Sequence, residues 1–253
     1  APDQPIAALF PESEKPNSGA CCFPPLLRAL ERLAWSPERM PRVCELLCAL
    51  VPFTRSDYPE NAPARSLSKI FLPELPQTDA PLEMRSAVLA SLAVKHPDIV
   101  FKVRVYMLPR RTPISIRPSA RPEWREEGRR EQRVLLTDYR RAVEAAAAAA
   151  IASARGHVQR LKVLIENLPR VEEAGCAEAL LRELEAFAAR VTSDFDRETL
   201  RAELRTQLKL IELHWDKPFP LRSWAYRLAR LYHRLAPSDP VLRIAWLFRE
   251  PYP

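Results

Sequence analysis

The residues most able to bind a metal ion in this sequence are its five cysteines. Cys44 and Cys48 lie four residues apart, and Cys21 and Cys22 lie next to each other upstream. Four thiolates could hold zinc, but structural zinc sites usually use close ligand pairs held by turns, and adjacent cysteines are poor chelators. Cys44 and Cys48 also border an apolar stripe, where a free cysteine packs as a small hydrophobic residue. We therefore expect no metal site and interpret these thiols as packing groups.

Histidine and carboxylate side chains give no clearer site. The four histidines are scattered, with no two at metal-ligand spacing: His96, His157, His214 and His233. Neighbouring acids such as Glu126-Glu127 and Glu172-Glu173 lie among arginines or on predicted helix faces, where solvated charge is the usual outcome. The H-E-x-x-H, G-x-S-x-G and P-loop motifs are all missing from the sequence. The sequence therefore predicts no catalytic residue, and it predicts no bound cofactor.

An arginine-rich segment is the local feature that best indicates a function. Eleven arginines and no lysine occur between Arg104 and Arg141, against five acids, which leaves +6 of the chain's formal net charge of +7. Guanidinium groups suit phosphate and carboxylate, and an aromatic side chain in the segment could stack on a base. The candidate interaction surface consists of Arg110, Arg111, Arg117, Arg121, Trp124, Arg125, Arg129 and Arg130. The alternative is a solvated face in a chain that is arginine-rich throughout, and this is the commoner outcome for a charge stripe.

The composition predicts an all-α fold, either an irregular helical bundle or a solenoid-like stack of antiparallel helices. The 253 residues include four glycines and 26 prolines. Sheet proteins with tight hairpins need residues that accept positive φ, usually glycine, whereas helices separated by proline-marked joints do not. At 47% hydrophobic and 28% charged, the chain is globular in composition.

Hydrophobic periodicity and capping residues divide the chain into four parts. These are a flexible entry segment at 1–24, an N-terminal helical subdomain at 25–108, an Arg/Pro-rich connection at 109–136 and a C-terminal helical subdomain at 137–253. Ser36, before Pro37 and Glu38, is predicted to cap a helix. The β-branched run at 99–105 leaves a strand as an alternative to a helix. Val241 and Ile244 are predicted to face the core from the last helix.

Three groups of motifs follow one another in the sequence. They are ALERLAWSPE at 29–38; Ser66-Leu67, Ile70-Phe71, Pro76-Gln77-Thr78 and Arg85; and His214, Trp224-Ala225, Leu231-Tyr232, Leu235-Ala236-Pro237, Asp239-Pro240-Val241 and Trp246-Leu247-Phe248. This order resembles the helical regions of large bacterial multidomain proteins, some of them STAND- or NACHT-type NTPases of antiphage defence. Arg28 departs from that pattern, which has a tryptophan there. The resemblance implies a helical sensor or scaffold region, with any nucleotide chemistry elsewhere in a longer chain.

The expected setting is cytoplasmic, because no signal peptide and no long apolar run free of charge occurs. We expect no membrane partner. Since the chain begins with Ala1, we also expect a piece of a longer protein. The leading hypothesis is a non-enzymatic helical module that binds another protein or another domain of a longer polypeptide. The alternative is a helical nucleic-acid-binding module that uses the arginine-rich segment at 104–141, and a third is a small effector-like enzyme.

Changing Arg129 and Arg130 to glutamate tests the nucleic-acid alternative. If the segment contacts phosphates, DNA or RNA binding measured by fluorescence anisotropy falls with added salt and is lost in the double variant, because phosphate contacts release counterions. Electrostatic contacts are strongest at low salt, so an unmodified chain that binds no nucleic acid at about 50 mM salt contradicts the alternative.

Overall fold

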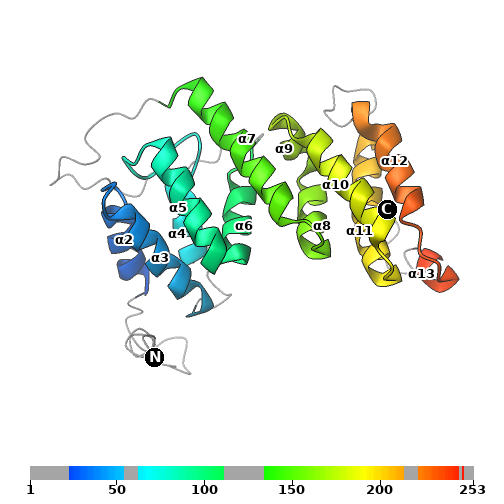
Figure 1. Ribbon diagram of the computed structural model, residues 1–253, viewed down its shortest axis with the longest axis horizontal. Helices are drawn as coiled ribbons and strands as arrows, with labels where there is room; N and C mark the ends of the chain where they lie inside the picture. Colours follow the sequence, from blue (N-terminus) through cyan, green and yellow to red (C-terminus); the bar gives the residue numbers. More distant parts are fainter. Residues whose placement is uncertain (1–22, 54–61, 111–133, 214–221, 245–246, 248–253) are drawn as a thin grey trace. The chain divides into compact units, whose positions relative to one another are not determined.

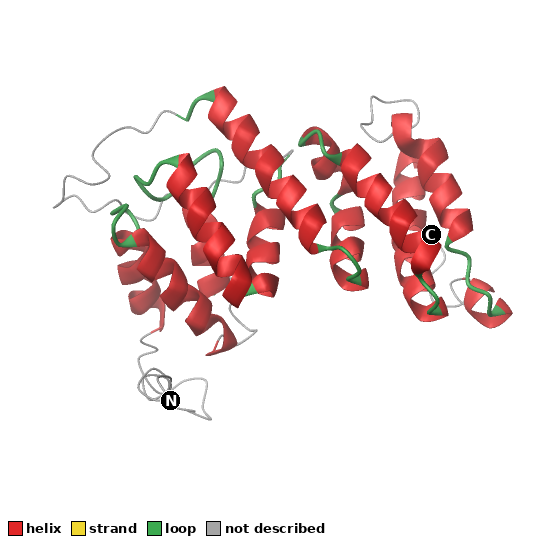
Figure 2. Cartoon of the chain, in the orientation of Figure 1, coloured by secondary structure: helices red, strands yellow, loops and turns green. Residues whose placement is uncertain are grey.

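The structure, a computed structural model, describes residues 23–53, 62–110, 134–213, 222–244 and 247. These ranges contain twelve α-helices and two short 3-10 helices but no strand, as Figure 2 shows. The prediction of an all-α fold is therefore confirmed. The strand alternative for 99–105 is wrong, because α6 runs from Pro97 to Tyr106. Proline at its first turn and Asp98 near its positive end favour the helix over the strand preference of the β-branched residues.

The chain separates into two compact units. Unit 1 contains residues 1–107 and 113–142, and unit 2 contains residues 108–112 and 143–253. The long helix α7, Leu136–Ser153, contributes its first seven residues to unit 1 and the rest to unit 2.

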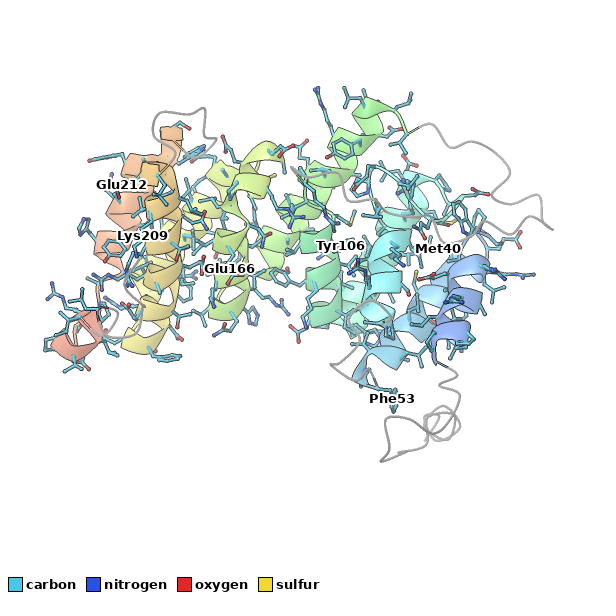
Figure 3. All side chains as sticks on the ribbon, turned by 180° about the vertical axis from the view of Figure 1, so that it is seen from behind. Met40, Phe53, Tyr106, Glu166, Lys209 and Glu212 are labelled. Carbon is cyan, nitrogen blue, oxygen red and sulfur yellow. The ribbon has the colours of Figure 1, made fainter. Side chains whose placement is uncertain are left out.

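Unit 1 contains α2 (Phe23–Leu33), α3 (Met40–Leu50), α4 (Pro63–Ile70), α5 (Leu82–Lys95) and α6, with a 3-10 turn at Val51–Phe53 (Figure 1). Helix α3 packs against α2 and α4, and α6 packs against α4 and α5. Trp35, Phe71 and Met40, the last labelled in Figure 3, are among the largest fully buried side chains. The first two motif groups therefore supply core residues of unit 1.

A buried carboxylate joins α2 to α4 inside unit 1. Ser66 Oγ donates a hydrogen bond of 2.6 Å to Glu31 Oε1, and Lys69 Nζ lies 3.5 Å from the same oxygen. Glu31 is 8% exposed and Ser66 3%. Burial of a charge is tolerated where it is paired and hydrogen-bonded, and both conditions are met here. The Ser66–Glu31 bond therefore fixes how these two helices meet.

Unit 2 contains the rest of α7, then α8 (Val158–Glu166), α9 (Leu168–Glu173), α10 (Ala177–Arg190), α11 (Asp194–Leu213), α12 (Ala225–Arg234) and α13 (Pro240–Ile244), with a 3-10 turn at Arg222–Trp224. Helix α11 is central, because it packs against α8, α12 and α13 (Figure 1). In the alanine run of α7, Ala146, Ala147 and Ala150 are buried. Small side chains allow close packing, which compensates for the little area that each one buries.

Two glycines mark joints of unit 2. Gly156, between α7 and α8, has a φ of +72°, and Gly175, before α10, has a φ of +73°. Both take the left-handed conformation that glycine adopts without steric cost.

Some predicted helix details are wrong. Helix α3 begins at Met40, after Arg39, and residues 34–39 form turns, so Ser36 does not cap it. Asp239, by contrast, does cap a helix: its Oδ1 accepts a 2.8 Å hydrogen bond from Val241 N at the start of α13.

None of the described helices combines the length and the apolar character that a membrane span requires.

Replacing Ser66 with alanine is expected to destabilise unit 1 by about 2 kcal/mol, because the buried Glu31 carboxylate loses its shortest hydrogen bond. The matched control is Ser68→Ala, since Ser68 Oγ donates to Ala64 O of its own helix and the backbone loses little without it. Calorimetry of the full chain measures both variants. Equal destabilisation by the two substitutions would contradict the role given to the Ser66–Glu31 bond.

Candidate interaction surface

The structure describes one residue of the sequence-predicted surface, Arg110, which is half-buried. The other seven, Arg111, Arg117, Arg121, Trp124, Arg125, Arg129 and Arg130, lie outside the described residues. Their use for nucleic acid or protein binding stays a prediction.

Arg170 of α9 fixes the backbone just before Arg110. Its guanidinium donates to Leu108 O at 2.7 Å, to Pro109 O at 2.8 Å and to Asn167 Oδ1 at 2.6 Å. Three hydrogen bonds from one planar group leave little rotational freedom on either side. The segment predicted as an interaction surface therefore starts from a fixed point on unit 2.

Other arginines of the 104–141 segment have contrasting environments. Arg104 is half-buried on α6, and burial lowers its pKa below the ordinary range of a guanidinium. Arg140 and Arg141 are exposed on α7. Of these three side chains, only Arg140 and Arg141 are thus open to solvent and available to a phosphate or a carboxylate.

The described cysteines are buried packing groups. Cys44, Cys48 and Cys176 are free thiols, each at most 7% exposed, and Cys44 Sγ lies 3.7 Å from Met40 Sδ. Burial raises the pKa of the Cys44 thiol far above its usual range and that of Cys48 to about 11. Among the described residues, no three His, Cys, Asp or Glu side chains cluster as metal ligands would. Cys21 and Cys22 lie outside this part of the chain.

Four large apolar side chains of unit 2 are exposed at the start of α11, on α13 and at Leu247 beyond it. Phe195 at the start of α11 is 67% exposed, Val241 and Ile244 of α13 are 67% and 51% exposed, and Leu247 is 55% exposed. We call these four residues the corner surface. The prediction that Val241 and Ile244 face the core is wrong, because α13 is five residues long and turns only Leu242 partly inward.

Asp194 holds this corner together. Its two carboxylate oxygens accept hydrogen bonds from the backbone N–H groups of Ser238 at 3.0 Å and Asp239 at 2.9 Å. These two donors hold the pKa of Asp194 below its ordinary value. The first residue of α11 thus satisfies the N–H groups that precede α13 and joins the start of α11 to the start of α13. Both helices are labelled in Figure 1.

A buried ionic cluster lies behind the corner. Glu198 accepts from Arg201 Nη1 at 3.2 Å and from Arg205 Nη2 at 2.9 Å, with both arginines less than 9% exposed. The Arg201 guanidinium stacks 4.4 Å from the ring centroid of Tyr232 on α12 and donates to Arg243 O of α13 at 3.4 Å. Arg201 therefore contacts α12 and α13 from α11 and orients both helices.

A shallow pocket of about 300 Å³ lies between the end of α10 and the start of α11. Of its polar lining groups, Ser193 accepts from Asp196 N and caps α11, while Arg190 pairs with Glu183 and donates to Ala186 O. These groups serve the local structure, so the pocket adds little to the candidate surface.

Comparison with known proteins gives no match: no family model, no curated protein and no solved structure is similar to this chain.

The corner surface was missed because periodicity shows which residues are apolar and not which of them are covered. Val241 and Ile244 are spaced as on a covered helix face, so the sequence holds no clear signal of their exposure. Asp194 follows Thr192 and Ser193, residue types that commonly cap helices, so part of its role is visible in the sequence. Its partner proved to be a different helix.

The buried thiols give a chemical prediction. In a Cys21→Ser, Cys22→Ser variant, we expect the three remaining cysteines to react with a thiol reagent at least about tenfold more slowly than after unfolding. At pH 8, a pKa of about 11 leaves a thiolate fraction on the order of 10⁻³ at Cys48. Absorbance of the released chromophore measures the rate. Native and denatured rates within a factor of about two would show that these thiols are accessible.

Proposed function

We propose that this chain is a non-enzymatic helical module that binds another protein, or another domain of a longer polypeptide, through the corner surface of unit 2. The observation that carries the proposal is the exposure of Phe195, Val241, Ile244 and Leu247 beside the Asp194 contact. Clustered exposed apolar side chains rimmed by polar groups commonly mark protein interaction sites. The rim here includes Asp196, Asp239 and Arg243.

The arrangement of this surface also supports the proposal. Asp194 and Arg201 attach α13 to α11 through three backbone groups, those of Ser238, Asp239 and Arg243. A surface that is held in place before binding loses less conformational entropy on association than one that must be ordered. The two contacts therefore hold the apolar side chains in place before a partner binds.

The larger context of the proposal comes from sequence resemblance. A helical sensor or scaffold region of a bacterial defence-type multidomain protein would recognise its trigger through such a module, with any NTPase or effector activity elsewhere. Binding of nucleic acid by the 104–141 segment is the second candidate, and exposed Arg140 and Arg141 favour it.

The test is quantitative affinity capture with the full chain and with a Val241→Ser, Ile244→Ser variant. A protein captured by the unmodified chain is purified, and its direct affinity is then measured with both. Loss of two central apolar contacts is expected to weaken binding at least about tenfold. The helical circular dichroism should not change, because both side chains are exposed.

Val94→Ser is the matched control, since Val94 is 84% exposed on α5 of unit 1. This variant should bind like the unmodified chain. Equal binding by the Val241→Ser, Ile244→Ser variant would overturn the proposal.

A further inference from the structure

The outward face of α12 is basic and aromatic. The helix sequence AYRLARLYHR contains no acid. Leu228 and Leu231 are buried, whereas Tyr226 is 74% exposed and Arg230, His233 and Arg234 are also exposed. Residues three and four apart share a helix face, so these exposed side chains form one stripe. We call Tyr226, Arg230, His233 and Arg234 the α12 stripe.

The two arginine side chains of the stripe have no polar partner among the described residues. Within that part of the chain, neither the Arg230 nor the Arg234 side chain forms a hydrogen bond or an ion pair. On the same helix, Arg227 pairs with Glu178 and Glu185 of α10, and it lies 5.6 Å from the Trp224 ring. The inward arginine of α12 is thus neutralised while the outward ones keep their full charge.

The charge of unit 2 is concentrated around this stripe. The described residues of unit 2 include sixteen basic and thirteen acidic side chains. Of these, four basic side chains and one acidic side chain lie at 225–244. This short stretch therefore carries the whole net charge of +3, and the remainder is balanced. A local excess of one sign attracts a partner of the opposite sign.

The helix dipole accounts for part of this pattern. His233 and Arg234 lie in the last turn of α12, where basic side chains are favoured. Arg230 lies one turn earlier, and like charges at i and i+4 destabilise a helix by a few tenths of a kcal/mol. The dipole explains neither the positive charge at Arg230 nor the exposure of Tyr226.

We infer that the α12 stripe recognises an acidic amphipathic helix of a partner protein. On such a helix, carboxylates one turn apart match the spacing of Arg230 and Arg234, and an apolar residue can cover Tyr226. The inference rests on the proposed function, because the corner surface of α11, α13 and Leu247 is proposed to accept the apolar face of the same kind of partner. Nucleic acid fits less well, since it offers nothing to exposed Val241 and Ile244, and the rest of unit 2 is balanced in charge.

The test uses two labelled peptides of roughly 18 residues with leucines at the same helical positions, one with glutamates and the other with lysines on the flanks. A single-stranded and a double-stranded oligonucleotide are the other probes. Anisotropy with the full chain at about 50 mM salt is expected to show binding of the acidic peptide. Arg230→Glu, Arg234→Glu should weaken this binding at least about fivefold, and about 500 mM salt should reduce the difference.

Arg28→Glu, Arg32→Glu is the matched control, because these arginines are also exposed and four residues apart on α2. It should leave binding unchanged. The inference is overturned if the acidic peptide does not bind, if the lysine peptide or an oligonucleotide binds more tightly, or if the two arginine pairs have equal effects.

The Val241→Ser, Ile244→Ser variant separates this inference from the proposed function. If it weakens peptide binding while Arg230→Glu, Arg234→Glu does not, the corner surface stands and the α12 stripe fails. If only the arginine variant weakens binding, the stripe stands and the corner surface fails.

Discussion

The carboxylate of Asp194 is the contact on which the arrangement of the candidate surface depends. Helix α13 is five residues long, too short to be stable through its own hydrogen bonds. Its position is therefore set from outside, by Asp194 accepting from Ser238 and Asp239 and by Arg201 donating to Arg243 O. Because both contacts come from α11, the corner surface is built on the longest described helix of unit 2.

The ionic cluster behind the corner contains two guanidinium groups and one carboxylate. Glu198 bridges Arg201 and Arg205, and the Tyr232 ring provides a further favourable surface for the positive charge of Arg201. A buried ion pair is weak evidence for stability, since desolvation opposes the attraction, but its directional bonds can specify one arrangement among several. In unit 2 the arrangement specified is that of α11, α12 and α13. By specifying this arrangement, the buried cluster thus also determines which faces of α12 and α13 point outward.

The fold class followed from the sequence, whereas the candidate surface did not. Scarce glycine and proline-marked joints predicted helices, and the described ranges contain helices and no strand. Ser36 was a convincing cap by residue type, yet the chain turns through 34–39 before α3 begins, because tertiary packing of buried Trp35 and Met40 outweighs local capping. Val241 and Ile244 have a core-like pattern, and only the packing of α13 against α11 shows that they remain uncovered. The arginines at 111–130 were visible in sequence, but they lie outside the described residues.

An apolar corner and a basic stripe on successive helices would have different roles in recognition. Apolar burial supplies most of the affinity in proportion to the area covered and does not distinguish one apolar helix from another. Unpaired arginines contribute less affinity but penalise partners that bring positive charge, and they accelerate association with acidic ones. Since the Arg230 and Arg234 side chains form no ion pair with any described residue, a partner carboxylate could bind them without breaking one of those pairs. On the proposed function, unit 2 would offer affinity at α13 and selectivity at α12. Each surface could be changed without altering buried residues such as Leu204, Leu228 and Leu231.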